Sequence, residues 1–258
     1  MANGELSAPR APRIFLDDRE SVREGLVIVR GSSARRLARS LHLRRGDAVE
    51  VIHDRSLYHV GLTRVGEDVI EAEIRETCPL RPDPSPEVTL CPAIIRPQRF
   101  DLIIEKATEL GVAGIQPVLA TRSLATSPSR QRQARWRRLI TEAAEQCRRE
   151  QRPQLHEPVE VEALVAAPPA GGAVRIFASE REPSRRVAEA LGMAAPPQRV
   201  QILVGPEGGF TVPEADAAIA HGWIPVTLSP RPLRPETAAV VATALVQEAL
   251  RPGDQPAR

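Results

Sequence analysis

The chain has 258 residues, of which 42% are hydrophobic and 26% are charged, and its formal net charge is +2. These values are ordinary for a globular protein, and we expect two modest domains. No apolar run approaches the roughly 20 residues of a membrane-spanning helix, and the first residues lack the apolar core of a secretory signal, so a cytoplasmic location is expected.

The cysteines and histidines show no recognisable metal-binding pattern. Cys78, Cys91 and Cys147 are widely spaced and never form C-x-x-C, which argues against a disulfide framework and against zinc. None of the five histidines falls in an H-E-x-x-H motif, so none is assigned a chemical role. Buried thiols and no metal are therefore expected.

Arginine is concentrated in two stretches. Residues 10–45 carry ten arginines against four acids, and residues 122–152 carry nine against three, a difference of +6 in each case. Such stretches can neutralise the phosphates of a nucleic acid. The alternative is a solvated helix face with acids one turn away, such as Glu145 with Arg149. Lys106 is the only lysine, so the arginine excess fits genomic base composition as well as phosphate binding.

Short apolar or alternating runs, separated by Gly, Asp and Arg turns, follow Ile14 and predict a small β-barrel that carries the first basic stretch. The predicted strands are residues 26–29, 48–52, 58–65 and 69–74. One short helix is expected between them, because Ser33, Leu37 and Leu41 share a helical spacing and Ser32 or Ser33 can cap it.

A proline-rich segment, CPLRPDPSPE, follows at residues 78–87 and predicts an extended linker. We accordingly divide the chain into a barrel at 1–80, a linker at 81–87, a second domain at 88–251 and a tail at 252–258.

Beyond the linker, strands alternate with helices, which predicts an α/β domain with a parallel sheet covered by helices on both faces. The expected strands are residues 88–95, 115–119, 174–178, 200–204 and 224–228. The expected helices are residues 98–110, a basic helix with Trp136, Leu139, Ile140, Ala143, Ala144 and Cys147 on one face, and residues 236–250.

The segment QILVGPEGGFTVPEA, residues 201–215, is a buried strand that leads into a Gly-rich turn and then a helix. Ligands bind at the carboxyl ends of strands in open α/β sheets, and Gly208 and Gly209 allow the backbone to approach a ligand closely. Glu207 then faces the ligand or caps a helix. A plain strand-to-helix turn is the alternative, although it does not explain a carboxylate between Pro206 and two glycines.

A second cluster lies in residues 228–250, where a proline-stiffened loop carries Arg231 and Arg234. Pro235 and Glu236 suit the first turn of the helix that follows, whereas Arg234 has no structural explanation of this kind. The small side chains of this helix permit close packing against another backbone or a partner subunit. We expect the two clusters to follow neighbouring strands.

The sequence lacks the motifs that are typical of several other classes of α/β enzyme. No Gly-Lys-Ser/Thr phosphate loop, no G-x-G-x-x-G after a strand and no G-x-S-x-G elbow is present. ATPases, Rossmann dehydrogenases and serine hydrolases are thereby disfavoured.

Four ordered motifs, IEKATELGV (104–112), EAAEQCRR (142–149), LVGPEGGF (203–210) and LRPETA (233–238), resemble the RsmE family. Members of this family methylate N3 of a uridine in 16S ribosomal RNA. The family belongs to the SPOUT superfamily, whose C-terminal chain forms a trefoil knot. The N-terminal segment LHLRRGDAVEV resembles a PUA-like RNA-binding barrel.

The resemblance implies S-adenosylmethionine as cofactor, a homodimer, and 16S ribosomal RNA, in the assembled small subunit, as partner. The implied cofactor-binding residues are Leu119, Ala120, Thr121, Val204, Gly205, Pro206, Glu207, Gly208, Gly209, Leu228, Ser229, Arg231 and Leu233. Arg122, Gln146 and Arg149 fall in motif positions and are the RNA-binding candidates there. Arg35, Arg36 and Arg39, in the first basic stretch, are the RNA-binding candidates of the barrel, although Arg35 and Arg36 stand where the family commonly has a histidine pair.

The chemistry requires an in-line attack and removal of the N3 proton. Arg234 is the candidate that stabilises negative charge on the uracil oxygens, and Glu207, Glu236 or a water is the candidate proton acceptor. Two alternatives stay open: another SPOUT transfer such as ribose 2′-O-methylation, and a non-catalytic RNA-binding protein of ribosome assembly.

Overall fold

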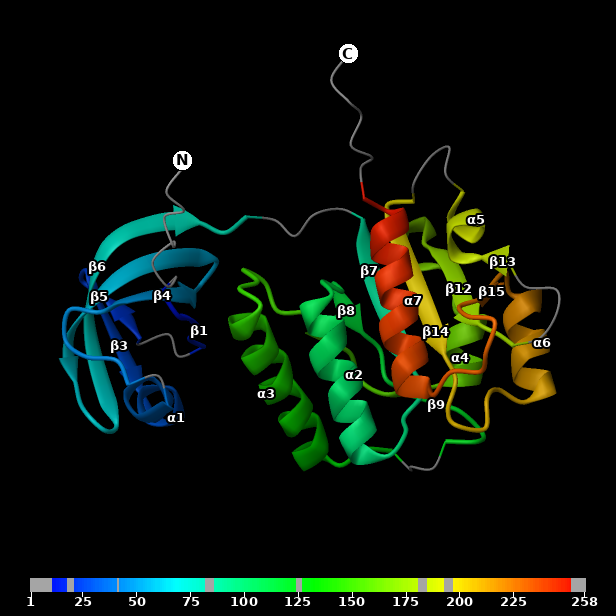
Figure 1. The fold of residues 1–258 in the computed structure, drawn as a ribbon, viewed down its shortest axis with the longest axis horizontal. Helices are drawn as coiled ribbons and strands as arrows, with labels where there is room; N and C mark the ends of the chain where they lie inside the picture. The colour runs from blue at the N-terminus through cyan, green and yellow to red at the C-terminus, as the bar shows by residue number, and fades with distance from the viewer. Residues whose placement is uncertain are drawn as a thin grey trace, which may run out of the picture. The chain divides into compact units, whose positions relative to one another are not determined.

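The computed structural model describes residues 11–17, 21–40, 42–81, 86–123, 127–180, 185–192 and 197–251 (Figure 1). The chain forms two compact units. The first contains Met1–Pro82 and Ala144–Gln151, and the second contains Asp83–Ala143 and Arg152–Arg258. No helix in the described part of the chain is long and apolar enough to cross a membrane.

The first unit is built on a six-stranded sheet with the order β1-β4-β5-β6-β3-β2. Its strands are β1 (Arg13–Phe15), β2 (Val22–Arg23), β3 (Leu26–Arg30), β4 (Ala48–His53), β5 (Ser56–Val65) and β6 (Val69–Pro79). The four predicted strands are confirmed as β3 to β6. The predicted small barrel is present as a half-barrel: among the described strands, β1 and β2, three and two residues long, form the two edges of the sheet and pair with β4 and β3.

A short helical segment covers the core of this half-barrel. It consists of α1 (Gly31–Arg35) and a π-helical turn, η1 (Arg36–Ser40), which buries Leu37. The helix begins at Gly31, whose φ of +62° turns the chain directly out of β3. The predicted cap is therefore wrong, because Ser32 and Ser33 lie inside the helix, and Leu41 lies outside the described residues.

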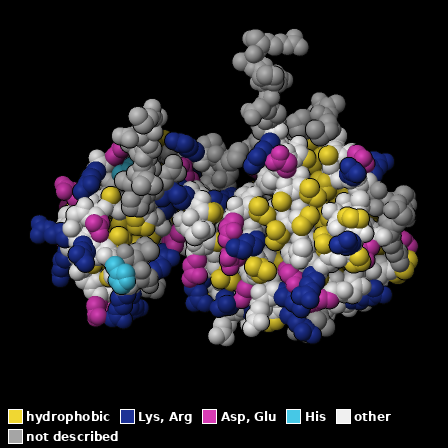
Figure 2. All heavy atoms as spheres, in the orientation of Figure 1, with side chains coloured by type: hydrophobic (Ala, Val, Ile, Leu, Met, Phe, Trp, Pro, Cys, Tyr) yellow, Lys and Arg dark blue, Asp and Glu magenta, His cyan; other side chains and the backbone are white. Residues whose placement is uncertain are grey.

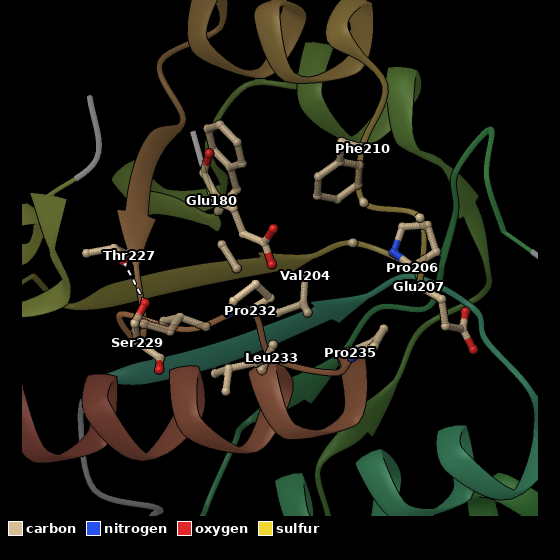
Figure 3. Close-up of a pocket in the computed structure, with 18 of the residues that line it drawn as sticks. Glu180, Val204, Pro206, Glu207, Phe210, Thr227, Ser229, Pro232, Leu233 and Pro235 are labelled. Carbon is tan, nitrogen blue, oxygen red and sulfur yellow. Dashed lines mark hydrogen bonds between the residues drawn. The ribbon is translucent and has the colours of Figure 1, made fainter. Parts of the chain in front are cut away.

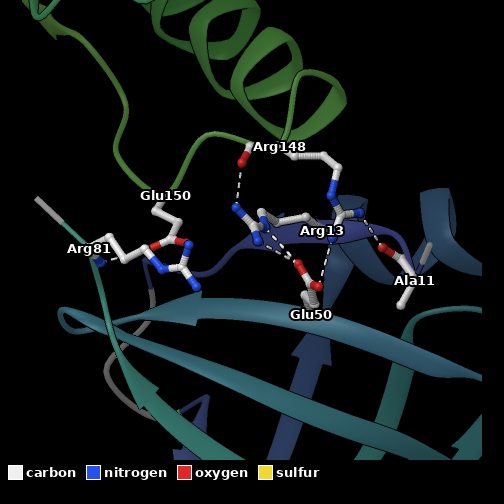
Figure 4. A network of polar contacts seen from close by, with 6 residues as sticks. All are labelled: Ala11, Arg13, Glu50, Arg81, Arg148 and Glu150. Atoms are coloured by element: carbon white, nitrogen blue, oxygen red, sulfur yellow. Dashed lines mark hydrogen bonds and ion pairs between the residues drawn. The ribbon is translucent and has the colours of Figure 1, made fainter. Parts of the chain in front are cut away.

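Residues 144–151, which comprise the last three residues of α3 (Arg130–Gln146) and the segment after it, belong to the first unit, where Arg148 takes part in a largely buried ionic network (Figure 4). The Glu50 carboxylate lies 2.7 Å from Arg13 Nη2 and 2.7 Å from Arg148 Nη2. Arg13 also donates to the Arg148 carbonyl, and Arg148 Nη1 donates to the Ala11 carbonyl at 2.7 Å. The side chains of Arg13 and Glu50 are only 7% and 12% exposed, so each charge depends on the other.

Glu50→Ala is expected to lower the free energy of unfolding of the first unit by about 3–5 kcal/mol, because it leaves two guanidinium groups without their carboxylate in a poorly solvated place. Tyr58, the only tyrosine, lies in this unit and reports its urea-induced unfolding. Glu71→Ala is the matched control, since Glu71 forms an exposed pair with Arg64 and its loss should cost less than about 1 kcal/mol. Equal losses in the two variants would contradict this account.

The second unit contains a seven-stranded, fully parallel sheet with the order β10-β8-β7-β14-β12-β15-β13. Its strands are β7 (Glu87–Pro92), β8 (Gly114–Ile115), β10 (Gln154–Leu155), β12 (Val174–Ala178), β13 (Arg185–Arg186), β14 (Arg199–Val204) and β15 (Ile224–Thr227). A separate parallel pair is formed by β9 (Val118–Leu119) and β11 (Val159–Glu160).

Helices cover both faces of the sheet, as predicted. They are α2 (Pro97–Glu109), α3, α4 (Val161–Ala166), α5 (Val187–Leu191), α6 (Val212–Ala220) and α7 (Pro235–Ala249). Successive residues of a strand point to opposite faces of the sheet, so each face has its own apolar core. Ile202 of β14 packs in one core with residues of α2, α3, α5 and α7, whereas the adjacent Leu203 packs in a second core with residues of α4 and α6. The sheet is therefore buried on both sides, as its apolar strands indicate.

Some predicted boundaries are wrong. The predicted strand 115–119 is interrupted at Gln116 and Pro117, and its halves, β8 and β9, belong to different sheets. Cys78 and Pro79 belong to β6 and Glu87 begins β7, while residues 82–85 of the predicted linker lie outside the described residues.

Candidate functional site

A cavity of about 660 Å³ lies at the carboxyl edge of three adjacent parallel strands, β14, β12 and β15 (Figure 3). Its lining comes mainly from the segments that follow these strands: residues 204–210, 177–180 and 227–233. Arg122, Ala215 of the helix after residue 210, and the start of α7 complete it. The two clusters seen in the sequence thus share one cavity, but they do not follow neighbouring strands, because β12 pairs with both β14 and β15.

The turn after β14 brings backbone to the cavity wall. Gly209 has φ of +65°, a conformation that side chains disfavour. A Cβ on Gly208 would lie 3.1 Å from Arg122 Cδ, and one on Gly205 would lie 3.2 Å from the Phe210 ring. Each of these positions thus favours glycine for its own reason. The turn therefore presents peptide groups, not side chains, to the cavity.

The loop after β15 forms the opposite part of the lining. Ser229 organises it, because its carbonyl accepts from Thr227 Oγ1 at 3.3 Å and its Oγ accepts from the Arg231 N–H at 3.2 Å. Pro230 and Pro232 restrict the same loop. Leu228, Ser229, Arg231 and Leu233, all predicted to contact the cofactor, line the cavity.

Ser179 and Glu180, which follow β12, also line the cavity, and sequence reasoning missed both. Figure 3 shows the Glu180 carboxylate pointing into the space between Phe210 and Pro232. The sequence could have suggested both residues, because they directly follow the predicted strand 174–178 and ligands bind at the carboxyl ends of parallel strands.

The three predicted catalytic residues are placed differently from one another. Glu207 lines the cavity, but its carboxylate points away from the middle of it (Figure 3). Arg234 is exposed at the N-terminal boundary of α7, and Glu236 is buried in the first turn; neither is among the lining residues. Arg99 of α2, which the sequence did not suggest, lies 3.8 Å from Glu207 Oε1 and 3.7 Å from Glu236 Oε1.

The predicted contact segment Leu119, Ala120 and Thr121 is not among the lining residues either. It is held beside them by Glu214, the third residue of α6. The Glu214 carboxylate accepts hydrogen bonds from the N–H of Thr121 at 2.8 Å and from the N–H of Thr211 at 2.6 Å. The capping box of Glu214 with Thr211 is visible in the sequence. Its hydrogen bond to Thr121 is not, because the two residues are 93 positions apart, so this role of Glu214 was not predicted.

Glu214 also has a shifted pKa. Burial by itself would raise the pKa of this carboxyl, but the backbone N–H groups of Thr121 and Thr211 outweigh burial and lower it below the ordinary value of 4.5. The ionised form is thus the one that holds the loop.

Glu214→Gln is expected to lower the free energy of unfolding by about 1–3 kcal/mol at neutral pH, because charge-assisted hydrogen bonds are lost. The folded-state pKa lies below the unfolded one, so the carboxylate stabilises the fold above pH 4.5 and this contribution disappears as the pH falls through the folded-state pKa. Denaturant titrations between neutral and acidic pH should therefore show the two proteins converging. Exposed Asp216, on the same helix, provides the control variant Asp216→Asn, and a pH-independent difference for Glu214→Gln would refute the assignment.

The six predicted RNA-binding residues fall in both units. Arg35, Arg36 and Arg39 lie in the first unit, where they pair with Asp68, Glu145 and Glu67 respectively. Gln146, which is exposed, and Arg149 belong to the same unit.

Arg122 lies in the second unit, where Nη1 donates to the Gly208 carbonyl at 2.7 Å. Glu145, expected as a partner of Arg149, is buried and accepts from the Phe15 N–H at 3.0 Å.

Comparison with known proteins identifies the class and then the family. Residues 82–247 match the RNA methyltransferase domain, so the chain is an RNA methyltransferase by class. Ribosomal RNA small subunit methyltransferase E of Synechocystis sp. is 31% identical over 232 residues, which cover 90% of this chain and 76% of that protein. The counterpart in Aquifex aeolicus is 27% identical over 86% of this chain and 93% of its own length. The chain belongs to the ribosomal RNA small subunit methyltransferase E (RsmE) family.

Solved structures agree with this assignment. The chain is similar to ribosomal RNA small subunit methyltransferase E from Neisseria gonorrhoeae bound to S-adenosylmethionine, with 28% identity and a TM-score of 0.81 over 93% of this chain and 98% of that one. A methyltransferase from Legionella pneumophila, solved with the same cofactor, has 27% identity and a TM-score of 0.82 over the same shares.

Proposed function

We propose that the protein transfers a methyl group from S-adenosylmethionine to N3 of a uridine in 16S ribosomal RNA. The observation that carries the proposal is the glycine-walled cavity at the carboxyl edge of β14, β12 and β15. It lies within the part of the chain that matches the RNA methyltransferase domain, and related structures from two bacteria hold this cofactor.

The residues of the cavity fit the cofactor. The volume of about 660 Å³ is in the range of small-molecule sites. Peptide groups of Gly205 to Gly209 are available to polar atoms, and Glu180 supplies a negative charge for a cationic ligand. Phe177, Val204 and Leu228 offer apolar surface for a base. When bound, the cofactor supplies an electrophilic methyl group on a sulfonium centre.

The residues of this chain must then orient uridine, remove the N3 proton and stabilise negative charge on the uracil. Arg234 is proposed to stabilise the uracil oxygens, since its side chain is exposed beside Leu233 and Pro235, which line the cavity. Glu236 is favoured over Glu207 as the group that accepts the N3 proton. Its Oε2 is buried and accepts no hydrogen bond among the described residues, an unusual state for a carboxylate oxygen.

The proposal is tested by supplying labelled S-adenosylmethionine with assembled small subunits or free 16S ribosomal RNA and identifying the methylated nucleoside. We expect 3-methyluridine, formed faster on assembled subunits. Arg234→Ala should lower kcat by about 100- to 1,000-fold, as loss of a charge-stabilising donor does, and Glu236→Gln should lower it more than Glu207→Gln. Detection of 2′-O-methylnucleosides alone would establish the alternative transfer, and no cofactor binding would favour the non-catalytic assembly protein.

We further propose that the protein is a homodimer that pairs through α7 and α2. Leu245 and Leu102, on these two contacting helices, are each 40% exposed, and Figure 2 shows hydrophobic side chains gathered over this part of the second unit. Small residues such as Ala242 line the buried side of α7. A second copy would cover the exposed leucines.

Sedimentation should give the mass of two chains for the natural protein and of one chain for Leu245→Glu. Ile219→Glu on α6, which replaces another exposed apolar residue (52% exposed), is the control that should remain dimeric. A single-chain mass for the unsubstituted protein would rule out the dimer.

We also propose that the C-terminal chain forms the SPOUT trefoil knot and that the first unit binds the ribosomal RNA. The knot is supported by the path of the chain: β15 lies beyond β12, yet α7, which follows at once, packs back against β7 and β14. RNA binding is supported by the arginines of residues 10–45, of which Arg35 and Arg39 remain more than half exposed in their ion pairs.

A further inference from the structure

The two longest strands of the first unit, β5 and β6, bring together a histidine, a glutamate and a cysteine. His59 is directly opposite Glu76, and Cys78 is opposite Leu57. Residues two apart on a strand point to the same face, so all three side chains share one face of the sheet. One nitrogen, one oxygen and one sulfur from these residues lie within 4.8 Å of one another.

The local strand geometry favours this convergence. The register shifts after His59, which pairs with Glu76 while Val60 pairs with Ile74, so Arg75 is an extra residue in β6. Such a bulge changes the direction in which neighbouring side chains point. His59 and Cys78 are half-buried and Glu76 is exposed, which leaves access from solvent.

We propose that His59, Glu76 and Cys78 bind one zinc ion, with solvent as the fourth ligand. Imidazole, thiolate and carboxylate are zinc ligands, whereas calcium and magnesium prefer oxygen alone. In a tetrahedral zinc site, bonds of about 2.0–2.3 Å place ligand atoms roughly 3.3–3.7 Å apart. Cys78 Sγ and Glu76 Oε1 are already 3.5 Å apart, and the remaining separations, at most 4.8 Å, need to close by up to about 1.5 Å.

The protonation chemistry is balanced. Without metal, the Cys78 thiol donates to Glu76. Its pKa is raised by desolvation and by this carboxylate, while nearby Arg81 lowers it and Glu150 raises it. Zinc would take the place of the thiol proton, which leaves to solvent, and the Glu76 oxygen would turn from hydrogen-bond acceptor to ligand. A simple thiol–carboxylate hydrogen bond is the competing explanation of the cluster.

Cobalt(II) titration of the full, chelator-treated chain separates the two explanations. We expect saturation at a single equivalent, with visible bands of a four-coordinate ion and a thiolate-to-cobalt charge-transfer band in the near ultraviolet. Zinc should displace the cobalt and raise the thermal midpoint of the first unit. Cys78→Ser should abolish the charge-transfer band.

His59→Ala should weaken zinc binding by about 100-fold or more, since even outer-shell substitutions cost 10- to 100-fold. Cys147→Ser, at another half-buried thiol of the same unit, is the matched control and should leave the spectrum unchanged. Absence of saturable binding, or a charge-transfer band that survives in Cys78→Ser, overturns the proposal. Because these readouts do not involve methyl transfer, the result is independent of the proposed enzymatic activity.

Discussion

The parallel register of β14, β12 and β15 is the constraint on which the site depends. Ile176 and Phe177 of β12 pair with Ile202 and Leu203 on one side and with Ile224 and Pro225 on the other, so the three strands end at one edge. Three loops that are far apart in the sequence must therefore meet there. Two cores, one on each face of the sheet, hold the strands in this register. The cavity follows from the register, and its chemistry follows from the residues that the loops carry.

Carboxylates in poorly solvated places connect segments that the sheets alone would leave independent. Glu214 joins the segment before Arg122 to the start of α6, and Glu50 joins β1 to Arg148. In each case a buried acid is matched by several donors, which is the condition under which burying a charge is tolerated. Glu236 lacks such a set of donors among the described residues: its Oε2 is buried without a hydrogen bond, and Arg99 lies 3.7 Å from its other oxygen. This state is the basis of the role proposed for Glu236 in the reaction.

The location of the site was predictable from short motifs, but its composition was not. Gly205 to Gly209 were identified because a Gly-rich turn follows a buried strand of a parallel sheet, and the loop from Leu228 to Leu233 was identified from the resemblance to the RsmE family. Glu180 was missed because it stands in no motif, and Arg99 because its partners are more than one hundred positions away along the chain. Conversely, residues 119–121 were expected to line the cavity, but they are not among its lining residues, and the N–H of Thr121 is bonded to Glu214 instead.

By itself, the sequence determined the α/β class, the boundaries of most long elements and the family, because periodicity and local motifs act over a few residues. Two-residue strands such as β10 and β13 carry no periodicity and were not predicted. Only the tertiary structure decided that β12 separates the two ligand-facing clusters, that residues 144–151 pack with the first unit, and that His59, Glu76 and Cys78 converge. These are long-range pairings, and a local pattern contains no information about which distant segment will satisfy a buried charge or lie beside a given strand.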